Sequence, residues 1–433
     1  MIKDLIKKIT PSFLINCYYL TWAFLGAVFY RFPSKKLIIV GVTGTNGKST
    51  VVEMIDAILK EAGFKTASSS SICFKIGSKE WPNNLKMTMP GRLKIQKFLR
   101  QAVNAECEYA VLEVTSEGIK QFRHRFIDFD AAVFTNITPE HIERHGGFEA
   151  YKTAKGELFR SLKNGIKKNT ISIVNLDDPN ADYFLQFIAE GKFGYKIKDE
   201  LFTQLPSKEI NIVEVKNYQL MPNGSRFTID GKEFNLNLLG KFNIYNSLAA
   251  ICFGLSQGIN IETCKKGLEK IKEVPGRMEV VIEKPFTAIV DYAHTPAALE
   301  NVYKTLKTSR LICVLGAAGG GRDKWKRPEL GQIAANYCQK IILTDEDPYD
   351  ENPEQILSEI KKGILTANFQ ESNLYEILDR KEAIKKAVQI AGAGDTVVIT
   401  GKGSEPWMCI AKGEKIPWDD RKIVRELSLE VLP

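Results

Sequence analysis

A glycine-rich stretch that follows a short apolar run constrains this chain more than any other feature. The run Leu37-Ile38-Ile39-Val40 leads into Gly41-Val42-Thr43-Gly44-Thr45-Asn46-Gly47-Lys48-Ser49-Thr50, and a helical pattern continues to Gly63. A strand, a tight loop and a helix in this order gather backbone N–H groups and a helix N-terminus, which together can hold polyphosphate. Lys48 would neutralise phosphate oxygens there, and Ser49 would offer a hydroxyl to Mg²⁺. The stretch therefore predicts a nucleotide-binding α/β domain.

The spacing of further apolar runs predicts the rest of the fold. Runs separated by helical stretches indicate a mainly parallel sheet with helices on its faces, at 110–112, 131–134 and 171–174. Alternating segments between 218 and 239 predict antiparallel hairpins at the edge of that sheet. A second β/α series follows Pro275-Gly276, with strands at 288–290, 311–314, 341–343 and 396–399.

The chain is too long for a single hydrophobic core, because such cores stop growing at roughly 250–300 residues. We therefore predict three segments. These are a hydrophobic N-terminal helical segment (1–36), a central phosphate-loop domain with a mainly parallel sheet and antiparallel edge hairpins (37–276), and a Rossmann-like α/β C-terminal domain (277–433).

The segment 13–30 is uncharged over 18 residues, which reaches the lower limit for a membrane-spanning helix. Polar residues such as Asn16 and Thr21 interrupt it, which favours a helix packed on the protein or lying on a membrane surface over a spanning one. Basic residues flank the segment on both sides, namely Lys3, Lys7, Lys8, Arg31, Lys35 and Lys36.

Composition narrows the partners and the compartment. With 60 Lys+Arg against 52 Asp+Glu, the net charge of +8 suits a small anionic substrate, and no basic stripe with interleaved aromatics indicates nucleic acid. The eight cysteines are scattered singly, without the spacing of a zinc site or of a disulfide framework. Reduced, unpaired cysteines in the cytoplasm are the expectation.

The phosphate loop is one residue longer than the strict Walker spacing, and in this form, Gly41-x-x-Gly44-Thr45-Asn46-Gly47-Lys48-Ser49, it resembles the ATP loop of the Mur ligases and folylpolyglutamate synthetases. Later motifs resemble, in the same order from about residue 37 to 421, those of the diamino-acid-adding Mur ligases. They are 113–118, 134–141, 175–178, 276–279, 291–296, 322–328 and 401–405.

The resemblance implies an ATP-dependent, ADP-forming ligase of peptidoglycan precursor synthesis, and so a part in cell wall biogenesis, cell shape and cell division. Such an enzyme activates the carboxylate of a muramyl-dipeptide-like acceptor as an acyl phosphate. A diamino acid, lysine or diaminopimelate-like, then captures the acyl group. ATP and Mg²⁺ are the implied cofactors, and the acceptor and the amino acid are the implied small-molecule partners.

The resemblance also implies roles for individual residues. Catalytic roles fall to Lys48, His141, Lys155 and Arg277. ATP would be bound by Gly44, Thr45, Asn46, Gly47, Lys48, Ser49, Thr50, Asn243, Asn246, Arg277, Asp291 and His294, and helix capping is the alternative role for the two asparagines. Metal would be held by Ser49, Glu113, His141 and Lys155, the last as a carbamate. Substrates would be bound by Thr88, Thr115, Ser116, Arg123, Arg322, Asp347, Gly401 and Glu405.

Residue type alone favours plainer roles for two of these side chains. Lys155 would be an exposed helix lysine, and a lone histidine such as His141 is more often structural than a metal ligand.

Three departures from the family pattern bear on the substrates. Glu346-Asp347-Pro348-Tyr349 stands where the diaminopimelate-adding enzymes carry Asp-Asn-Pro-Arg, so lysine or another diamine is as plausible as meso-diaminopimelate. Glu117 and Ser404 replace the usual histidines. Only some 40 residues precede the phosphate loop, so we expect no N-terminal UDP-binding domain, and residues 13–30 would instead bring the enzyme to a membrane-near acceptor.

Two other functions remain to be weighed. One is a folylpolyglutamate-type or poly-glutamate ligase acting on another acceptor, against which the motifs 291–296 and 322–328 argue. The other is a non-catalytic nucleotide-binding scaffold, which would have no need of a joint set of metal and phosphate residues. We expect a monomer in the cytoplasm, peripheral at the inner face of the membrane.

Overall fold

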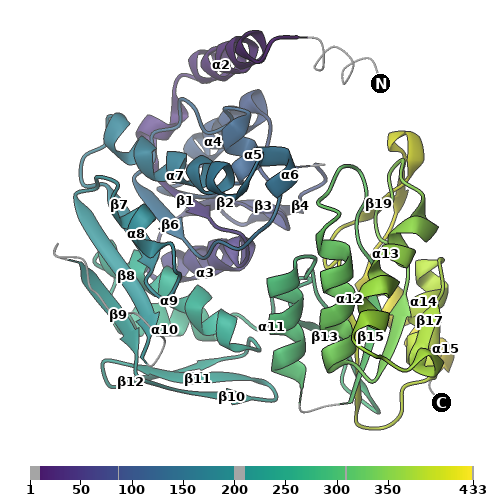
Figure 1. Ribbon diagram of the computed structural model, residues 1–433. Helices are drawn as coiled ribbons and strands as arrows, with labels where there is room; N and C mark the ends of the chain where they lie inside the picture. Colours follow the sequence, from purple (N-terminus) through teal and green to yellow (C-terminus); the bar gives the residue numbers. More distant parts are fainter. Residues whose placement is uncertain (1–9, 86, 199–209, 308–309, 432–433) are drawn as a thin grey trace.

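The phosphate-loop strand lies in the middle of a nine-stranded sheet (Figure 1). The computed structural model describes residues 10–85, 87–198, 210–307 and 310–431. The strand order is β4 (Lys79–Pro82), β3 (Cys73–Ile76), β2 (Thr66–Ser69), β5 (Tyr109–Glu113), β1 (Ile38–Thr43), β6 (Ala131–Phe134), β7 (Ile171–Asn175), β8 (Gly191–Ile197) and β9 (Asn211–Val215). All pairs from β2 to β9 are parallel, and β3 and β4 form an antiparallel edge. The predicted mainly parallel sheet is confirmed.

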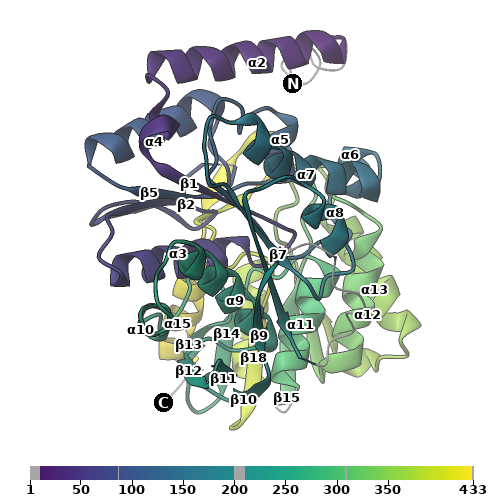
Figure 2. The same cartoon turned by 90° about the vertical axis from the view of Figure 1, so that its left-hand side faces the viewer.

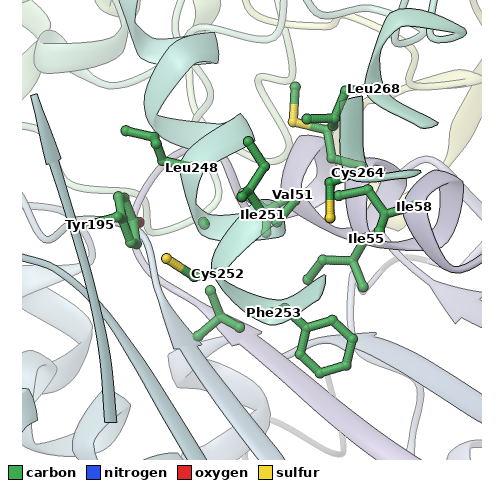
Figure 3. Packing of buried hydrophobic residues seen from close by; sticks show 14 of the residues in the cluster. Val51, Ile55, Ile58, Tyr195, Leu248, Ile251, Cys252, Phe253, Cys264 and Leu268 are labelled. Carbon is green, nitrogen blue, oxygen red and sulfur yellow. The ribbon is translucent and has the colours of Figure 1, made fainter. Parts of the chain in front are cut away.

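Both faces of this sheet are covered by helices, which is why its strands read as continuous apolar runs. One face packs against α3 (Lys48–Glu61), α9 (Lys241–Ser256) and α10 (Ile261–Glu269). The other packs against α4 (Arg92–Asn104), α5 (Ser116–Lys120), α7 (Phe148–Asn164) and α8 (Ala181–Leu185). Figure 3 shows the first of these cores, where Ile55 and Ile58 of α3 approach Ile251 of α9 and Leu268 of α10.

The predicted antiparallel hairpins of residues 217–236 lie beside β9, the edge strand of the large sheet, but they do not pair with it. They form a separate antiparallel sheet of β10 (Asn217–Met221), β11 (Gly224–Ile229) and β12 (Lys232–Leu236). The physical reason is their one-sided apolar pattern. Phe227 and Phe234 stack with ring centroids 4.9 Å apart and are buried in the core shared with α9 and β8. The hairpins therefore pack the apolar face of their own sheet against this core instead of hydrogen-bonding to the edge strand of the large sheet.

The C-terminal sheet has six strands and confirms the Rossmann-like expectation. Its order is β13 (Glu279–Ile282), β14 (Thr287–Val290), β18 (Asp395–Ile399), β15 (Arg310–Leu315), β16 (Lys340–Leu343) and β17 (Leu374–Glu376), and every pair except β13–β14 is parallel. Helices α11 (Pro296–Leu306), α12 (Lys326–Tyr337) and α13 (Pro353–Thr366) cover one face, and α14 (Arg380–Gln389) and α15 (Asp420–Val431) cover the other.

Short elements complete the fold. They are α6 (Ile142–His145), the small hairpin of β19 (Trp407–Cys409) and β20 (Lys415–Pro417), and the 3₁₀ turns η1 (Pro33–Lys36), η2 (Glu371–Asn373) and η3 (Ala411–Gly413). The change from the large sheet to the C-terminal sheet falls between α10 and β13. The division at 36 and 276 stays a prediction.

One pair of cysteines contradicts the expectation that all eight are unpaired. Cys313 of β15 and Cys338, which directly follows α12, form a disulfide with their Cα atoms 6.2 Å apart. The pair was missed because packing, not spacing, brings the end of α12 beside β15, where Gln339 N donates to Leu311 O. The other six cysteines are free, and Cys17 is the exposed one among them.

The N-terminal apolar segment forms the helix α2 (Ser12–Phe29), which lies along the outside of α4 (Figure 2). By length and composition it could cross a membrane, and only 17% of its residues are buried. The flanking Lys3, Lys7 and Lys8 lie outside the described residues.

Candidate active site

A cavity of about 460 Å³ lies between the large sheet and the C-terminal sheet. Its walls come from the loops that follow β1, β5 and β6 on one side and β14, β15, β16 and β18 on the other, so the carboxyl ends of two parallel sheets face each other. The cavity brings together most of the residues that the sequence nominated. These are Gly44, Thr45, Asn46, Gly47, Lys48, Ser49, Thr50, Thr88, Glu113, Thr115, Ser116, His141, Lys155, Asn246, Arg277, Asp291, His294, Arg322, Asp347, Gly401 and Glu405.

Two glycines allow the phosphate loop to take its shape. Gly44 has φ of 151° and Gly47 has φ of 84°, a region that side-chain-bearing residues rarely adopt. A Cβ on Gly47 would lie 2.3 Å from Asn246 Oδ1, and one on Gly44 would lie 1.9 Å from Thr135 Oγ1. Thr135 also donates a hydrogen bond of 2.7 Å to Asn46 O. The strand end after β6 therefore holds the loop from behind.

Lys48, Ser49 and Glu113 meet at the bottom of the cavity. Ser49 Oγ donates to Glu113 Oε2 at 2.7 Å, and Ser71 N donates to the same oxygen at 2.9 Å. Lys48 Nζ lies 3.8 Å from Glu113 Oε1, and burial lowers the pKa of this lysine. Arg277 reaches across the cleft and donates from Nη2 to Ser71 Oγ at 3.2 Å. Ser71 is a lining residue that no sequence motif had singled out.

Lys155 is fully buried, so the expectation from residue type that it is an exposed helix lysine is wrong. Its Nζ donates to Gly44 O at 2.6 Å and lies 4.5 Å from the centre of the Tyr151 ring. Burial lowers the pKa of Lys155 well below its usual value, and the nearby Lys48 lowers it further. A lowered pKa enlarges the fraction of this amine that is uncharged.

His141 lies next to this lysine at the start of α6, with φ of 57°. Its Nδ1 atom is buried and has no hydrogen-bond partner. Burial lowers the pKa of His141, and the charge of Arg322 lowers it further. A neutral imidazole with a free nitrogen can act as a ligand.

The first wall of the C-terminal side is built on the turn after β14. Asp291 accepts hydrogen bonds from Met278 N (2.7 Å) and Ala293 N (2.6 Å), so this carboxylate holds the turn that joins the two sides. His294 Nδ1 lies 2.8 Å from Tyr292 O, and burial lowers the pKa of His294 well below its usual value. Asp291 and His294 both line the cavity from this turn, opposite the phosphate loop.

Three carboxylates, Glu346, Asp347 and Glu405, form the far wall, and the buried Lys402 lies behind them. Lys402 Nζ donates to Asp347 Oδ1 at 2.8 Å and to Glu405 Oε2 at 2.6 Å. Glu346 Oε2 is buried without a partner, and burial raises the pKa of this side chain to about 7. A Cβ on Gly401 would lie 2.4 Å from Glu346 Oε2. Lys402 and Glu346 were not nominated from the sequence, although both adjoin motif residues that were.

Two nominated residues, Arg123 and Asn243, lie behind the cavity wall. Arg123 Nη1 donates to Met89 O at 2.6 Å, which braces the segment that carries Thr88. Asn243 Oδ1 accepts a hydrogen bond of 2.9 Å from Asn246 Nδ2. Neither asparagine caps a helix, because α9 begins at Lys241 after Gly240. The contacts give Arg123 and Asn243 positioning roles.

A buried ion pair joins the two sides of the cleft. Lys326 Nζ donates to Glu140 Oε1 at 3.0 Å and to His294 O at 3.0 Å. Nearby, Asp323 accepts hydrogen bonds from Ile142 N and Glu143 N at 3.0 and 3.2 Å, at the N-terminus of α6. Both Glu140 and Lys326 fall within motifs quoted above, but their pairing needed the tertiary structure.

Comparison with known proteins places the chain among ligases. A family model of the Mur ligase middle domain matches residues 42–254, and one of the Mur ligase, glutamate ligase domain matches residues 276–403. The chain is 38% identical over 413 residues to the UDP-N-acetylmuramoyl-L-alanyl-D-glutamate--2,6-diaminopimelate ligase of Syntrophomonas wolfei, covering 94% of this chain and 81% of the relative. It is 35% identical to the ligase of the same name from Geobacillus thermodenitrificans, covering 93% and 81%.

Solved structures agree on the fold. A structure of a UDP-N-acetylmuramoyl-L-alanyl-D-glutamate--2,6-diaminopimelate ligase superposes with a TM-score of 0.58 at 31% identity, covering 90% of this chain and 78% of that one. Mycobacterium tuberculosis folylpolyglutamate synthase complexed with ADP and AMPPCP superposes with a TM-score of 0.69 at 17% identity, covering 88% and 92%. The second likeness concerns the fold alone.

A phosphate loop facing a second α/β domain across a cleft full of lysines and carboxylates defines an ATP-dependent enzyme that couples two small substrates. The matches above show which one: the chain belongs to the Mur ligase family. It is thus an ATP-dependent ligase that forms an amide bond. The expectation that no UDP-binding domain is present stays a prediction.

Proposed function

We propose that this ligase adds a diamino acid, lysine or diaminopimelate-like, to the terminal carboxylate of a muramyl-dipeptide-like acceptor in peptidoglycan precursor synthesis. The observation that carries the proposal is the single cavity in which Lys48 and Arg277 converge from opposite sides, next to Glu405 and Arg322. Relatives at 35–38% identity are named for the addition of 2,6-diaminopimelate to such an acceptor.

The reaction divides between the two sides of the cavity. The acceptor carboxylate attacks the γ-phosphorus of ATP, the bond to the bridging oxygen breaks, and ADP leaves. Lys48 and Arg277 neutralise the oxygens of the transferred group. The amino group then attacks the acyl carbon, phosphate leaves, and the nitrogen loses a proton. Closure of the cleft keeps water from the acyl phosphate, which would otherwise hydrolyse.

Mg²⁺ fits the loop side of this cavity. Ser49 Oγ and Glu113 Oε2 are 2.7 Å apart, and the buried Nδ1 atom of His141 has no hydrogen-bond partner. Within the described ranges no group of three or more His, Cys, Asp or Glu side chains is gathered as a metal site, so protein side chains of these types alone do not complete one. Ser49, Glu113, His141 and a carbamate on Lys155 would hold the ions together with ATP oxygens. When bound, Mg²⁺ stabilises the negative charge of the phosphates.

The carbamate forms when the neutral Lys155 amine attacks CO₂, making a N–C bond and releasing one proton. The lowered pKa of Lys155 favours the uncharged amine that this step needs. Lys155→Met should therefore abolish ligation and also remove the carbamate signal seen by ¹³C NMR in labelled bicarbonate. Lys152→Met is the matched control on the same helix, because Lys152 pairs with Glu149 away from Gly44. An unchanged carbamate signal in Lys155→Met would refute this role.

The far wall bears on the choice of amino acid. Arg322 can pair with a carboxylate of the amino acid, whereas Lys402 is already occupied by Asp347 and Glu405. Glu346 and Glu405 can receive the distal ammonium. Lysine, another diamine and meso-diaminopimelate are the candidates for the assay.

The decisive experiment measures ADP release from ATP and Mg²⁺ with a panel of amino acids, each combined with UDP-linked and UDP-free muramyl dipeptide. We expect release only when an acceptor and a diamino acid are both present. Lys48→Ala should lower the rate about 100-fold or more, because it removes a charge placed at the reacting phosphate. Lys60→Ala, at the partly exposed end of the same helix, should stay within about twofold. No release with any muramyl peptide would refute the proposal.

The same panel tests the alternative acceptors. A folate or poly-glutamate acceptor that alone supports ADP release would establish the second ligase type, and ATP binding without any release would establish a scaffold. We further propose that the enzyme acts as a monomer in the cytoplasm and contacts the inner face of the membrane through residues 13–30. Light scattering of the purified protein tests the monomer.

A further inference from the structure

Helix α2 presents a stripe of large apolar and aromatic side chains to the outside. Leu14, Tyr18, Trp22, Leu25 and Phe29 follow one another at intervals of three or four residues, so they share one side of the helix, and each is between 39% and 74% exposed. No charged residue occurs anywhere in Ser12–Phe29. A contiguous apolar face of this kind on a folded protein marks an interaction site.

The opposite side of α2 is fastened to the central domain over its C-terminal half. Its small residues Ala23, Gly26 and Ala27 are buried against α4. Near the middle of α2, the Arg92 guanidinium stacks 3.8 Å from the centre of the Tyr19 ring. These contacts keep the axis of α2 parallel to the surface of the domain (Figure 2).

The far end is held as well. The Phe24 ring lies 5.4 Å from that of Phe126, and Arg100 donates two hydrogen bonds to Tyr30 O at 2.9 and 2.7 Å. A membrane-spanning arrangement would break these contacts and expose the seam of small residues. The structure therefore favours a helix whose axis lies parallel to the surface that its exposed side contacts.

The two stretches of sequence that form this region, one around α2 and one around α4, contain basic residues but no Asp or Glu. The stretch 5–52 has none, and neither has 81–105, which contains all of α4. Exposed bases lie on the segments next to this face, namely Arg31, Lys35 and Lys36 directly after α2, and Lys94 and Lys97 on α4, the helix that α2 packs against. Asp128, which accepts a hydrogen bond from Ser34, is an acidic residue beside this region. An apolar strip bordered by bases complements an anionic lipid surface.

We propose that α2 and the exposed bases around it form a docking surface for an anionic phospholipid leaflet, with α2 lying in the interface and its aromatic and aliphatic side chains inserted. A second copy of the chain is a poorer partner, because a two-fold contact would place the same bases opposite one another. The insertion is peripheral and reversible.

The position of the surface gives it a use. Helix α4 begins at Arg92, shortly after the segment that Arg123 braces and that carries Thr88 into the cavity. A docked enzyme would hold its acceptor wall close to the lipid, which suits an acceptor that is itself at the membrane. This use rests on the proposed ligase activity, and the lipid contact itself deepens the membrane contact proposed above for residues 13–30.

The test is flotation of the full chain with vesicles of phosphatidylcholine alone or with about one-third phosphatidylglycerol. We expect binding to the anionic vesicles, weaker binding to the neutral ones, and loss of the difference at high salt because the charges are screened. Alkaline carbonate should release the protein from the vesicles, whereas a spanning helix would stay.

Two sets of variants separate the apolar from the basic contribution. Leu14→Glu/Trp22→Glu/Leu25→Glu should lower vesicle binding about tenfold or more, with Leu429→Glu, an exposed leucine on α15 at the other end of the molecule (Figure 1), as the control. Lys94→Glu/Lys97→Glu should lower binding to anionic vesicles by a similar factor. Its control is Lys362→Glu/Lys381→Glu, which makes the same charge change on the C-terminal domain.

Every variant should release ADP with a water-soluble acceptor at the wild-type rate, which shows that it has folded and keeps this test separate from the ligase assay. Wild-type binding by the triple glutamate variant would overturn the proposal. So would equal binding to neutral and anionic vesicles, resistance to carbonate, or a dimer in solution that the triple glutamate variant abolishes.

Discussion

Removing Lys326 from the buried ion pair across the cleft should penalise the closed enzyme selectively. Lys326 Nζ lies 3.0 and 3.3 Å from the two carboxylate oxygens of Glu140, and the two side chains are 4% and 3% exposed. Loss of one partner from a buried pair costs about 3–5 kcal/mol because the other charge is left unpaired. In an open cleft the remaining carboxylate meets water, so the penalty falls on the closed state alone.

We therefore expect Lys326→Met to lower kcat/KM for ADP release about 100-fold or more, since about 1.4 kcal/mol corresponds to a factor of ten. The double variant Glu140→Gln/Lys326→Met leaves no unpaired charge and should recover at least about tenfold of that loss. Lys324→Met is the matched control. Its side chain is 52% exposed and pairs with Glu351 at the surface, so its effect should stay within about twofold.

A coupled ADP assay on the wild type, Lys326→Met, Glu140→Gln and the double variant completes the cycle, with circular dichroism to show that each is folded. If the fold-loss of kcat/KM in the double variant equalled the product of the fold-losses in the two single variants, the side chains would act independently and the reasoning would be refuted. A loss of kcat/KM in Lys324→Met as large as in Lys326→Met would also contradict the reasoning. The effect would then come from removing any positive charge from this segment, and not from breaking the buried ion pair.

Three further predictions concern the loop, the far wall and the C-terminal core. Gly47→Ala would place its Cβ 2.3 Å from Asn246 Oδ1 at a φ of 84°, so ATP affinity measured by calorimetry should fall at least about tenfold, and the melting temperature should also fall because the folded loop is strained. Burial raises the pKa of Glu346 from 4.5 to about 7, so its contribution to stability decreases by about 3 kcal/mol as pH rises through that interval. Glu346→Gln should accordingly raise the melting temperature at pH 8 and much less at pH 5, and an equal shift at both would contradict the assignment. Arg380 donates to both carboxylate oxygens of the buried Asp420 at 2.9 and 2.8 Å, so Arg380→Leu should lower the free energy of unfolding in urea by about 3–5 kcal/mol, and Arg380→Leu/Asp420→Leu by less.

The central strands of both sheets could be predicted because they are buried on two faces and read as apolar runs, whereas exposed edge strands such as β4 and β17 were not predicted. The run 131–134 is β6 (Ala131–Phe134) to the residue, and 171–174 is extended in β7 by one residue only. The hairpins of 217–236 were predicted at the edge of the large sheet, but that they form a sheet of their own was not, since alternation shows that a strand has one apolar face but not what that face will meet.

The candidate site divides in a similar way. Its loop residues were found because Gly44, Gly47 and Lys48 stand at fixed intervals in the chain. The pairing of Glu140 with Lys326 was not, because the two residues are 186 positions apart and meet only when the cleft forms.

What the sequence determined by itself is therefore local: where strands and helices begin, which glycines a phosphate loop needs, and which ligase family the motifs resemble. The tertiary structure alone decided that Lys155 is a buried amine with a lowered pKa, that Cys313 bonds to Cys338, and that α2 keeps an apolar face exposed. The reason is physical. Backbone conformation depends on neighbours in the chain, whereas desolvation, ion pairing and exposure depend on groups that only folding brings together.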